Sequence, residues 1–269
     1  MIGLARSILA ALDEKREIAP LSQDNPRFDL DAAYAVSGAL TAARMARNEH
    51  PAGWKIGLTN HAVWQDFGVH APIWAPMYEH TIQASAPGGG IVDLPADDFI
   101  DPRIEPEIVL RIARTPRSDM SPEELLGCID AVGHGFEIVQ SVYGGRPAKA
   151  ADIVAAAGFH GALVHGPLVP IDSDDANIWA QQLSTFSLAL YRNGVEVERG
   201  VAANVLGGPL TALHHLVAGL ETRPSARGIE PGDLITTGTV TKACPVASGE
   251  TWATMIEGLP LLGMRLRFT

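Results

Sequence analysis

The segment RIEPEIVLRIA, residues 103–113, has the two-residue periodicity of a β-strand. One side of the expected strand carries isoleucine, leucine and proline, as a strand facing a core does. The other side carries Glu105 and Glu107. Because residues two apart point the same way and lie about 6.6 Å apart, the two carboxylates are expected to converge on one patch.

Two carboxylates this close repel each other unless a positive charge lies between them. Mg²⁺ or Mn²⁺ would supply that charge, because both prefer carboxylate oxygens and keep positions open for water and substrate. The alternative is a solvated strand face, on which Arg103 and Arg111 pair with the acids. The strand pattern alone leaves both interpretations open.

Glu137, within GHGFEIVQS (residues 133–141), is a third possible metal ligand. It lies between Phe136 and Ile138, so an isolated carboxylate again interrupts an apolar strand, where burying it unpaired would be costly. A surface position on a one-sided sheet is the alternative. Three acids without any His or Cys ligand spacing indicate magnesium or manganese over zinc.

Lys55, within GWKIGLT (residues 53–59), is the candidate for proton transfer. A partly apolar pocket would lower the pKa of its ammonium group toward neutrality, which suits a general acid or base. An ordinary surface lysine is the alternative. The segment GDLITTGT (residues 232–239) ends in small hydroxyl and glycine residues, which could offer donors to a substrate carboxylate or simply form a turn.

Four of the nine histidines divide into two groups. His134 and His160 fall in glycine-containing turns near the acidic strands, whereas His214 and His215 lie in an expected helix and are assigned structural roles. The sequence contains no G-x-S-x-G elbow, phosphate-binding loop or dinucleotide fingerprint. A serine hydrolase and a nicotinamide enzyme are therefore disfavoured.

Composition sets the broad class. The chain has 269 residues, 46% of them hydrophobic, which allows one large domain with an appendage. A net charge of -11 makes nucleic acids and anionic membranes poor partners. No apolar run approaches the roughly 18 residues of a membrane span. Two distant cysteines, Cys128 and Cys244, are expected to be free thiols, and a cytoplasmic location is expected.

The order of elements predicts an α+β protein. Residues 1–50 have the pattern of amphipathic and alanine-rich helices, and short β-branched segments separated by Gly and Pro follow them. RNGV (residues 192–195) predicts a tight hairpin. Further helices are expected within residues 121–132, with Ser121 as N-cap, and within residues 208–221.

The chain contains, in this order, GWKIGLT, RIEPEI, FEIVQS, GGPLTALHHLV and GDLITTGT. As an ordered set they resemble the 2-keto-4-pentenoate hydratase and 4-oxalocrotonate decarboxylase family, within the fumarylacetoacetase C-terminal-like superfamily. The resemblance implies a mixed β-sandwich roll behind a smaller N-terminal helical region, and a homo-oligomer. We place the mainly helical region at residues 1–80 and the fumarylacetoacetase-like catalytic domain at residues 81–269.

The resemblance also implies the composition of the site. It implies Mg²⁺ or Mn²⁺ held by Glu105, Glu107 and Glu137, with Lys55 as a catalytic residue. The implied chemistry is Lewis-acid stabilisation of the enolate of a chelated 2-oxo acid, while Lys55 moves protons. The residues expected to bind substrate are Gln140, Ser141 and Thr239.

A hydratase that adds water at C4 of a small 2-hydroxy-2,4-dienoate or 2-oxo-4-enoate, as in aromatic meta-cleavage catabolism, is the leading prediction. The alternatives are a 4-oxalocrotonate-type decarboxylase, an acylpyruvate C–C hydrolase and a catalytically altered metabolite-binding relative. A decarboxylase must hold a second carboxylate and therefore needs a cation near the pocket. Arg146 and Lys149 are the candidates for that cation.

The chain departs from the family pattern at three places. Gln140, Ser141 and Val142 stand where the family commonly has Asp-Ser-Arg, and Ile73 stands where it has an acid. The family's Asp-Asn-Ala-Ser segment is replaced by AAAGFHG, residues 155–161. His160, within that segment, is a candidate catalytic residue that substitutes for a lost polar group, and packing is its alternative role.

Overall fold

The computed structural model describes residues 1–86, 90–223 and 226–269, and its strands form two mixed sheets. The larger sheet has the spatial order β2 (Ile73–Tyr78), β1 (Pro51–Gly57), β11 (Leu234–Thr239), β5 (Arg103–Ile112), β6 (Ile129–Val139), β7 (His160–His165) and β3 (Ile82–Ala84). Two short strands flank this path: β12 (Cys244–Pro245) pairs with β5, and β8 (Val169–Pro170) pairs with β6.

The smaller sheet has the order β10 (Val195–Val201), β9 (Ser187–Arg192), β13 (Thr251–Glu257), β14 (Arg265–Phe268) and β4 (Ile91–Leu94). Both sheets contribute to one apolar core, in which Ile108 of β5 and Trp252 of β13 are fully buried. The predicted α+β fold with a mixed β-roll is confirmed. Cys128 and Cys244 are free, as expected.

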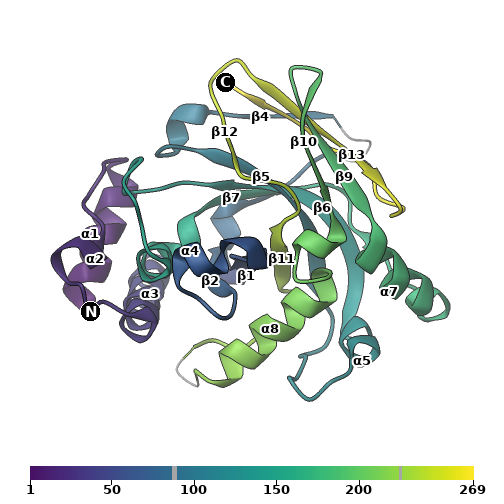
Figure 1. The fold of residues 1–269 in the computed structure, drawn as a ribbon, viewed down its shortest axis with the longest axis horizontal. Coiled ribbons are helices and arrows are strands. Elements are labelled where there is room, and N and C mark those ends of the chain that lie inside the picture. Colours follow the sequence, from purple (N-terminus) through teal and green to yellow (C-terminus); the bar gives the residue numbers. More distant parts are fainter. Residues whose placement is uncertain (87–89, 224–225) are drawn as a thin grey trace.

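The helices form two groups (Figure 1). The N-terminal helices α1 (Ile2–Asp13), α2 (Leu21–Asp24) and α3 (Leu30–Met45) share an apolar cluster with α6 (Ala150–Ala155) at one end of the molecule. The second group, α5 (Pro122–Leu126), α7 (Ala176–Thr185) and α8 (Pro209–Glu221), packs together against the larger sheet. A short helix, α4 (Trp64–Phe67), follows β1. No helix among the described residues is long and apolar enough to span a membrane.

The predicted domain limits, residues 1–80 and 81–269, stay a prediction. Within the first range, the three N-terminal helices end at Met45, and β1 and β2, with the short helix α4 between them, then pair into the larger sheet. This placement puts β1 beside β11 at the centre of the roll, with Lys55 in register with Thr236.

Two local predictions have different outcomes. The hairpin is confirmed: Asn193 and Gly194 have φ of 51° and 80°, as a type I′ turn requires. The helix expected over residues 121–132 has the predicted capping box at Ser121 but ends at Leu126. The prediction of helix beyond Leu126 was wrong, because Ile129 and the residues after it pair with β5 as the start of β6.

Strand β5 lies at the centre of the larger sheet, between β11 and β6. The pairing of β11 with β5 shifts register between Thr236 and Thr239, and Pro106 accepts the backbone hydrogen bond of Val240 beyond that shift. A proline inside a central strand is tolerated here because the shift removes the need for its missing N–H. The irregularity lies beside the two glutamates of β5.

Two helical glycines give matched predictions for stability. A methyl group added at Gly219 of α8 would overlap the indole ring of Trp74, whereas one added at Gly38 of α3 would meet nothing within 4 Å. We expect Gly219→Ala to lower the free energy of unfolding by about 1–3 kcal/mol and Gly38→Ala to raise it by about 0.5–1 kcal/mol. Urea denaturation of both variants checks this, and equal effects would contradict the packing described here.

Candidate active site

Three glutamates meet where β5 and β6 run side by side. Glu105 of β5 is in register with Glu137 of β6, and Glu107 lies two residues further along β5. One carboxylate oxygen from each lies within 4.8 Å of the other two. Glu107 and Glu137 have no exposed surface. The sheet therefore brings together the three acids that the sequence singled out, and a solvated strand face does not describe them.

Two oxygens of this cluster lack hydrogen bonds among the described residues. Glu107 Oε1 is buried without any partner, although the backbone N–H of Gly238 donates to Glu107 Oε2 at 2.7 Å. Glu137 Oε2 is also buried and has only the ion pair with the ammonium group of Lys55. Buried carboxylate oxygens without partners are costly unless a cation satisfies them. Hard oxygen ligands are the set that Mg²⁺ and Mn²⁺ prefer. The residues present thus fit a divalent cation.

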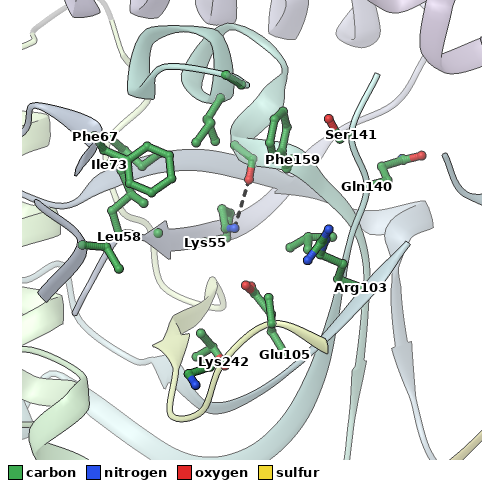
Figure 2. A pocket seen from close by; sticks show the side chains of 18 of the residues that line it. Lys55, Leu58, Phe67, Ile73, Arg103, Glu105, Gln140, Ser141, Phe159 and Lys242 are labelled. Atoms are coloured by element: carbon green, nitrogen blue, oxygen red, sulfur yellow. Dashed lines mark hydrogen bonds between the residues drawn. The ribbon is translucent and has the colours of Figure 1, made fainter. Parts of the chain in front are cut away.

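Lys55 is buried, and its Nζ donates to the carbonyl oxygen of Gly158 at 3.0 Å (Figure 2). The same Nζ lies 3.3 Å from Glu137 Oε2. Burial alone would lower the pKa of Lys55, but the charges of Glu137, Glu105 and Glu107 outweigh burial and raise it. The predicted lowering of this pKa is wrong for the protein alone, because three carboxylates surround the ammonium group.

The pKa values of the glutamates reflect their crowding. Burial raises the pKa of Glu105 to about 7, although the charge of Lys55 opposes the rise. Burial and the negative charges of Glu137 and Glu105 raise the pKa of Glu107 well above its usual range. Burial would also raise the pKa of Glu137, but the charge of Lys55 and a hydrogen bond from His160 lower it. Cation binding must therefore displace protons.

A left-handed turn holds Lys55 in place. Ala157, Gly158 and Phe159 have φ of 55°, 62° and 61°, a run that non-glycine residues rarely adopt. A Cβ at Gly158 would lie 2.9 Å from Lys55 Cδ and 2.9 Å from Ala75 Cβ. Glycine is needed here both for its backbone and for the space it leaves, and the sequence pattern gave no sign of this contact.

His160 contacts Glu137, one of the three glutamates of the candidate metal site. Its Nδ1 lies 2.9 Å from Glu137 Oε1, and its Nε2 lies 2.8 Å from Thr81 Oγ1. It lines a second cavity, of about 430 Å³, and Gln140 lines both this cavity and the one that contains Lys55. Sequence reasoning missed Thr81. His134 does not join the site, because it binds the backbone oxygen of Glu107 and Thr254 Oγ1.

The cavity in front of Lys55 has a volume of about 490 Å³. Gln140, Ser141 and Thr239, the expected substrate-binding residues, all line it. Thr239 Oγ1 is buried and has no hydrogen-bond partner within the described part of the chain, and Thr239 is in register with Glu107. A polar atom left free beside the carboxylate cluster is available to a bound molecule.

The two cations proposed for a second carboxylate differ in position. Arg146 lines the cavity, but its Nη1 donates to Glu17 Oε2 and to the carbonyl oxygens of Ile18 and Tyr143. Lys149 is not among the lining residues described. The sequence did not single out Arg103 as a cavity residue, although its position on the face of Glu105 was a sufficient signal.

A carboxylate cluster that fits a divalent cation, next to a buried lysine in an open cavity, defines a metal-dependent enzyme built on an α+β roll. The model of the fumarylacetoacetate (FAA) hydrolase C-terminal family matches residues 54–267. The chain belongs to this family.

Individual relatives narrow the comparison. The chain is 28% identical to a 4-oxalocrotonate decarboxylase of Pseudomonas sp. (strain CF600), over 96% of the chain and 94% of the relative. It is 29% identical to a 2-hydroxyhexa-2,4-dienoate hydratase of Comamonas testosteroni, over 93% and 90%. A solved 4-oxalocrotonate decarboxylase from Pseudomonas putida G7, complexed with magnesium and adipate, superimposes with a TM-score of 0.88 at 27% identity, covering 100% of this chain and 97% of that one. The family resemblance of the sequence motifs is confirmed.

The raised pKa of Glu105 predicts a stability that depends on pH. In the metal-free protein its folded pKa, about 7, exceeds the unfolded value of 4.5. The contribution of Glu105 to stability is therefore fully present below pH 4.5 and is lost as pH rises toward 7, by up to ~3 kcal/mol. Glu105→Gln should remove this decline and should also remove the gain in melting temperature on adding Mg²⁺. Parallel pH profiles of the two metal-free proteins, measured by urea denaturation, would contradict the prediction.

Proposed function

We propose that this protein is a divalent-metal-dependent hydratase that adds water to a small 2-hydroxy-2,4-dienoate or 2-oxo-4-enoate. The observation that carries the proposal is the cluster of Glu105, Glu107 and Glu137 around the ammonium group of Lys55. The hydratases among the relatives support it, as does the 2-oxo-hept-4-ene-1,7-dioate hydratase of Escherichia coli, 27% identical over 93% of the chain. Magnesium or manganese is the proposed ion, and a cytoplasmic homo-oligomer the proposed form.

Glu105, Glu107 and Glu137 would hold the cation, which when bound supplies Lewis-acid polarisation of the oxygens of a 2-oxo acid. Thr239 Oγ1 lies free in the cavity wall and donates to the substrate carboxylate. Gln140 and Ser141 contribute further donors from the end of β6.

Lys55 moves the proton. Its Nζ is held between the Gly158 carbonyl oxygen and Glu137, facing the cavity, and both partners are acceptors. The ammonium can therefore protonate the chain carbon of the dienol, and the amine can recover that proton from the attacking water. The hydroxyl of that water goes to C4, so the reaction adds one H₂O and needs no oxidant.

His160 is a positioning residue in this scheme. His160 does not line the cavity in front of Lys55. Its Nδ1 contacts the carboxylate of Glu137 and orients it, and Thr81 Oγ1 orients the imidazole ring of His160. A ligand carboxylate held from behind keeps its orientation toward the ion. The catalytic role assigned to His160 from sequence stays a prediction.

Removal and return of metal test the proposal. Protein treated with chelator should lose turnover of 2-hydroxypenta-2,4-dienoate and regain it with Mg²⁺ or Mn²⁺. Release of CO₂ from 4-oxalocrotonate would instead support a decarboxylase, and release of pyruvate from an acylpyruvate would support a C–C hydrolase. Turnover that is indifferent to metal would reject the mechanism.

The fit of Lys55 against Gly158 gives a second prediction. Gly158→Ala should lower kcat for 2-hydroxypenta-2,4-dienoate by at least about 100-fold, because displacing a proton-transfer group costs that order of rate. Gly68→Ala is the matched control: its φ is 63°, close to the 62° of Gly158, but its added methyl would meet nothing within 4 Å. Equal losses of kcat in the two variants would show that backbone strain, not the position of Lys55, is responsible.

A further inference from the structure

The cavity in front of Lys55 has two chemically different ends (Figure 2). Arg103, Gln140 and Ser141 lie on one side of Lys55, whereas Leu58, Phe67 and Ile73 lie on the other. A molecule anchored at the carboxylate cluster, between the two ends, must direct its carboxylate head to one of them and its tail to the other.

Arg103 marks the end for the carboxylate head. It lies two residues before Glu105 on the same face of β5, and among the described residues no hydrogen bond or ion pair involves its side chain. Among the residues that the structure describes, the amide nitrogen of Gln140 has no partner either, and its Oε1 accepts the Ile100 N–H. A free guanidinium and free donors suit a carboxylate.

The opposite end is apolar and is held in shape. Leu58 has φ of 55°, a left-handed conformation uncommon for leucine, and its carbonyl oxygen accepts a 2.7 Å hydrogen bond from Trp64 Nε1. This conformation places the side chain of Leu58 against the cavity beside Ile73, which is 2% exposed, and Phe67. Val63 also lines the cavity.

The remaining cationic side chains of the cavity are not placed to pair with a carboxylate at the apolar end. Lys55 is paired with Glu137, and Arg146 is held by Glu17 and two carbonyl oxygens. Lys242 lines the rim, but its side chain is 86% exposed and its Nζ lies 3.9 Å from Glu198. A carboxylate at the end of a substrate tail would be buried there without a partner, which is strongly unfavourable.

Size points the same way. At roughly 30 Å³ per small group, an eight-heavy-atom five-carbon acid is smaller than the cavity of about 490 Å³. A hydrocarbon substituent on such an acid gains from contact with the apolar side chains of the cavity.

We infer that the site selects a 2-oxo or 2-hydroxydienoic acid with an uncharged alkyl or aryl tail over one that ends in a second carboxylate. Leu58, Phe67 and Ile73 are the residues that set this selectivity, and Arg103 receives the C1 carboxylate. The inference rests on the proposed function, because it assumes that a 2-oxo acid occupies the metal site. It separates this chain from relatives named for dicarboxylate substrates.

Two saturated ligands of equal length test the inference without any turnover. 2-Oxohexanoate and 2-oxoadipate differ only in the terminal carboxylate, and calorimetry with Mg²⁺-loaded protein measures the affinity of each. We expect 2-oxohexanoate to bind at least tenfold more tightly, roughly the discrimination that a small apolar pocket provides. Equal or tighter binding of 2-oxoadipate would overturn the inference and leave the proposed hydratase standing.

Two variants test which end of the cavity binds the carboxylate head of the ligand and which binds its tail. Phe67→Ala should weaken binding of 2-oxohexanoate about fivefold and leave pyruvate, which has no tail, unchanged. Arg103→Gln should weaken the binding of 2-oxohexanoate and of pyruvate by the same factor. If Arg103→Gln instead weakened only 2-oxoadipate, Arg103 would be the site of a second carboxylate and the assignment would be reversed. If neither pyruvate nor 2-oxohexanoate bound the Mg²⁺-loaded wild type, the proposed function itself would fall.

Discussion

Electrostatic repulsion among three crowded carboxylates is the constraint on which the site depends. Glu105, Glu107 and Glu137 lie within 4.8 Å of one another, and two of them have no exposed surface. Such a cluster is stable only with positive charge among its members or with protons on some of its carboxyl groups. Lys55 supplies one charge from β1, and a divalent cation would supply the rest. The same crowding that destabilises the metal-free fold therefore gives the cation its affinity, as expected where binding sites are built at a cost in stability.

The backbone next to the site also gives up stability in order to position functional groups. Residues 157–159 form a left-handed turn, and Leu58 adopts a left-handed conformation of its own. Conformations of this kind cost on the order of 1–3 kcal/mol each and persist only where the surrounding structure holds them. Here one segment presents a carbonyl oxygen to Lys55, and the other presents an apolar side chain to the cavity. Phe159 and Leu58 both line the cavity in front of Lys55, so strained backbone borders the candidate site.

Strand alternation was enough to predict which glutamates share a face, because the two-residue period of RIEPEIVLRIA is local. The ordered motifs were enough to predict the roll, and the family match agrees. The direction of the pKa shift of Lys55 could not be obtained in this way, because it depends on neighbours from β5 and β6. The contacts of Gly158 and Thr81 depend likewise on tertiary packing. The end of α5 was misjudged because pairing with β5 outweighs helix propensity after Leu126.

The most direct test of the account is the position of the ion itself. A crystal of the protein grown with Mn²⁺ and measured at the manganese absorption edge should give one strong anomalous peak per chain, bounded by the carboxylates of Glu105, Glu107 and Glu137. A peak at any other position, or none at a Mn²⁺ concentration that supports turnover, would contradict the central claim.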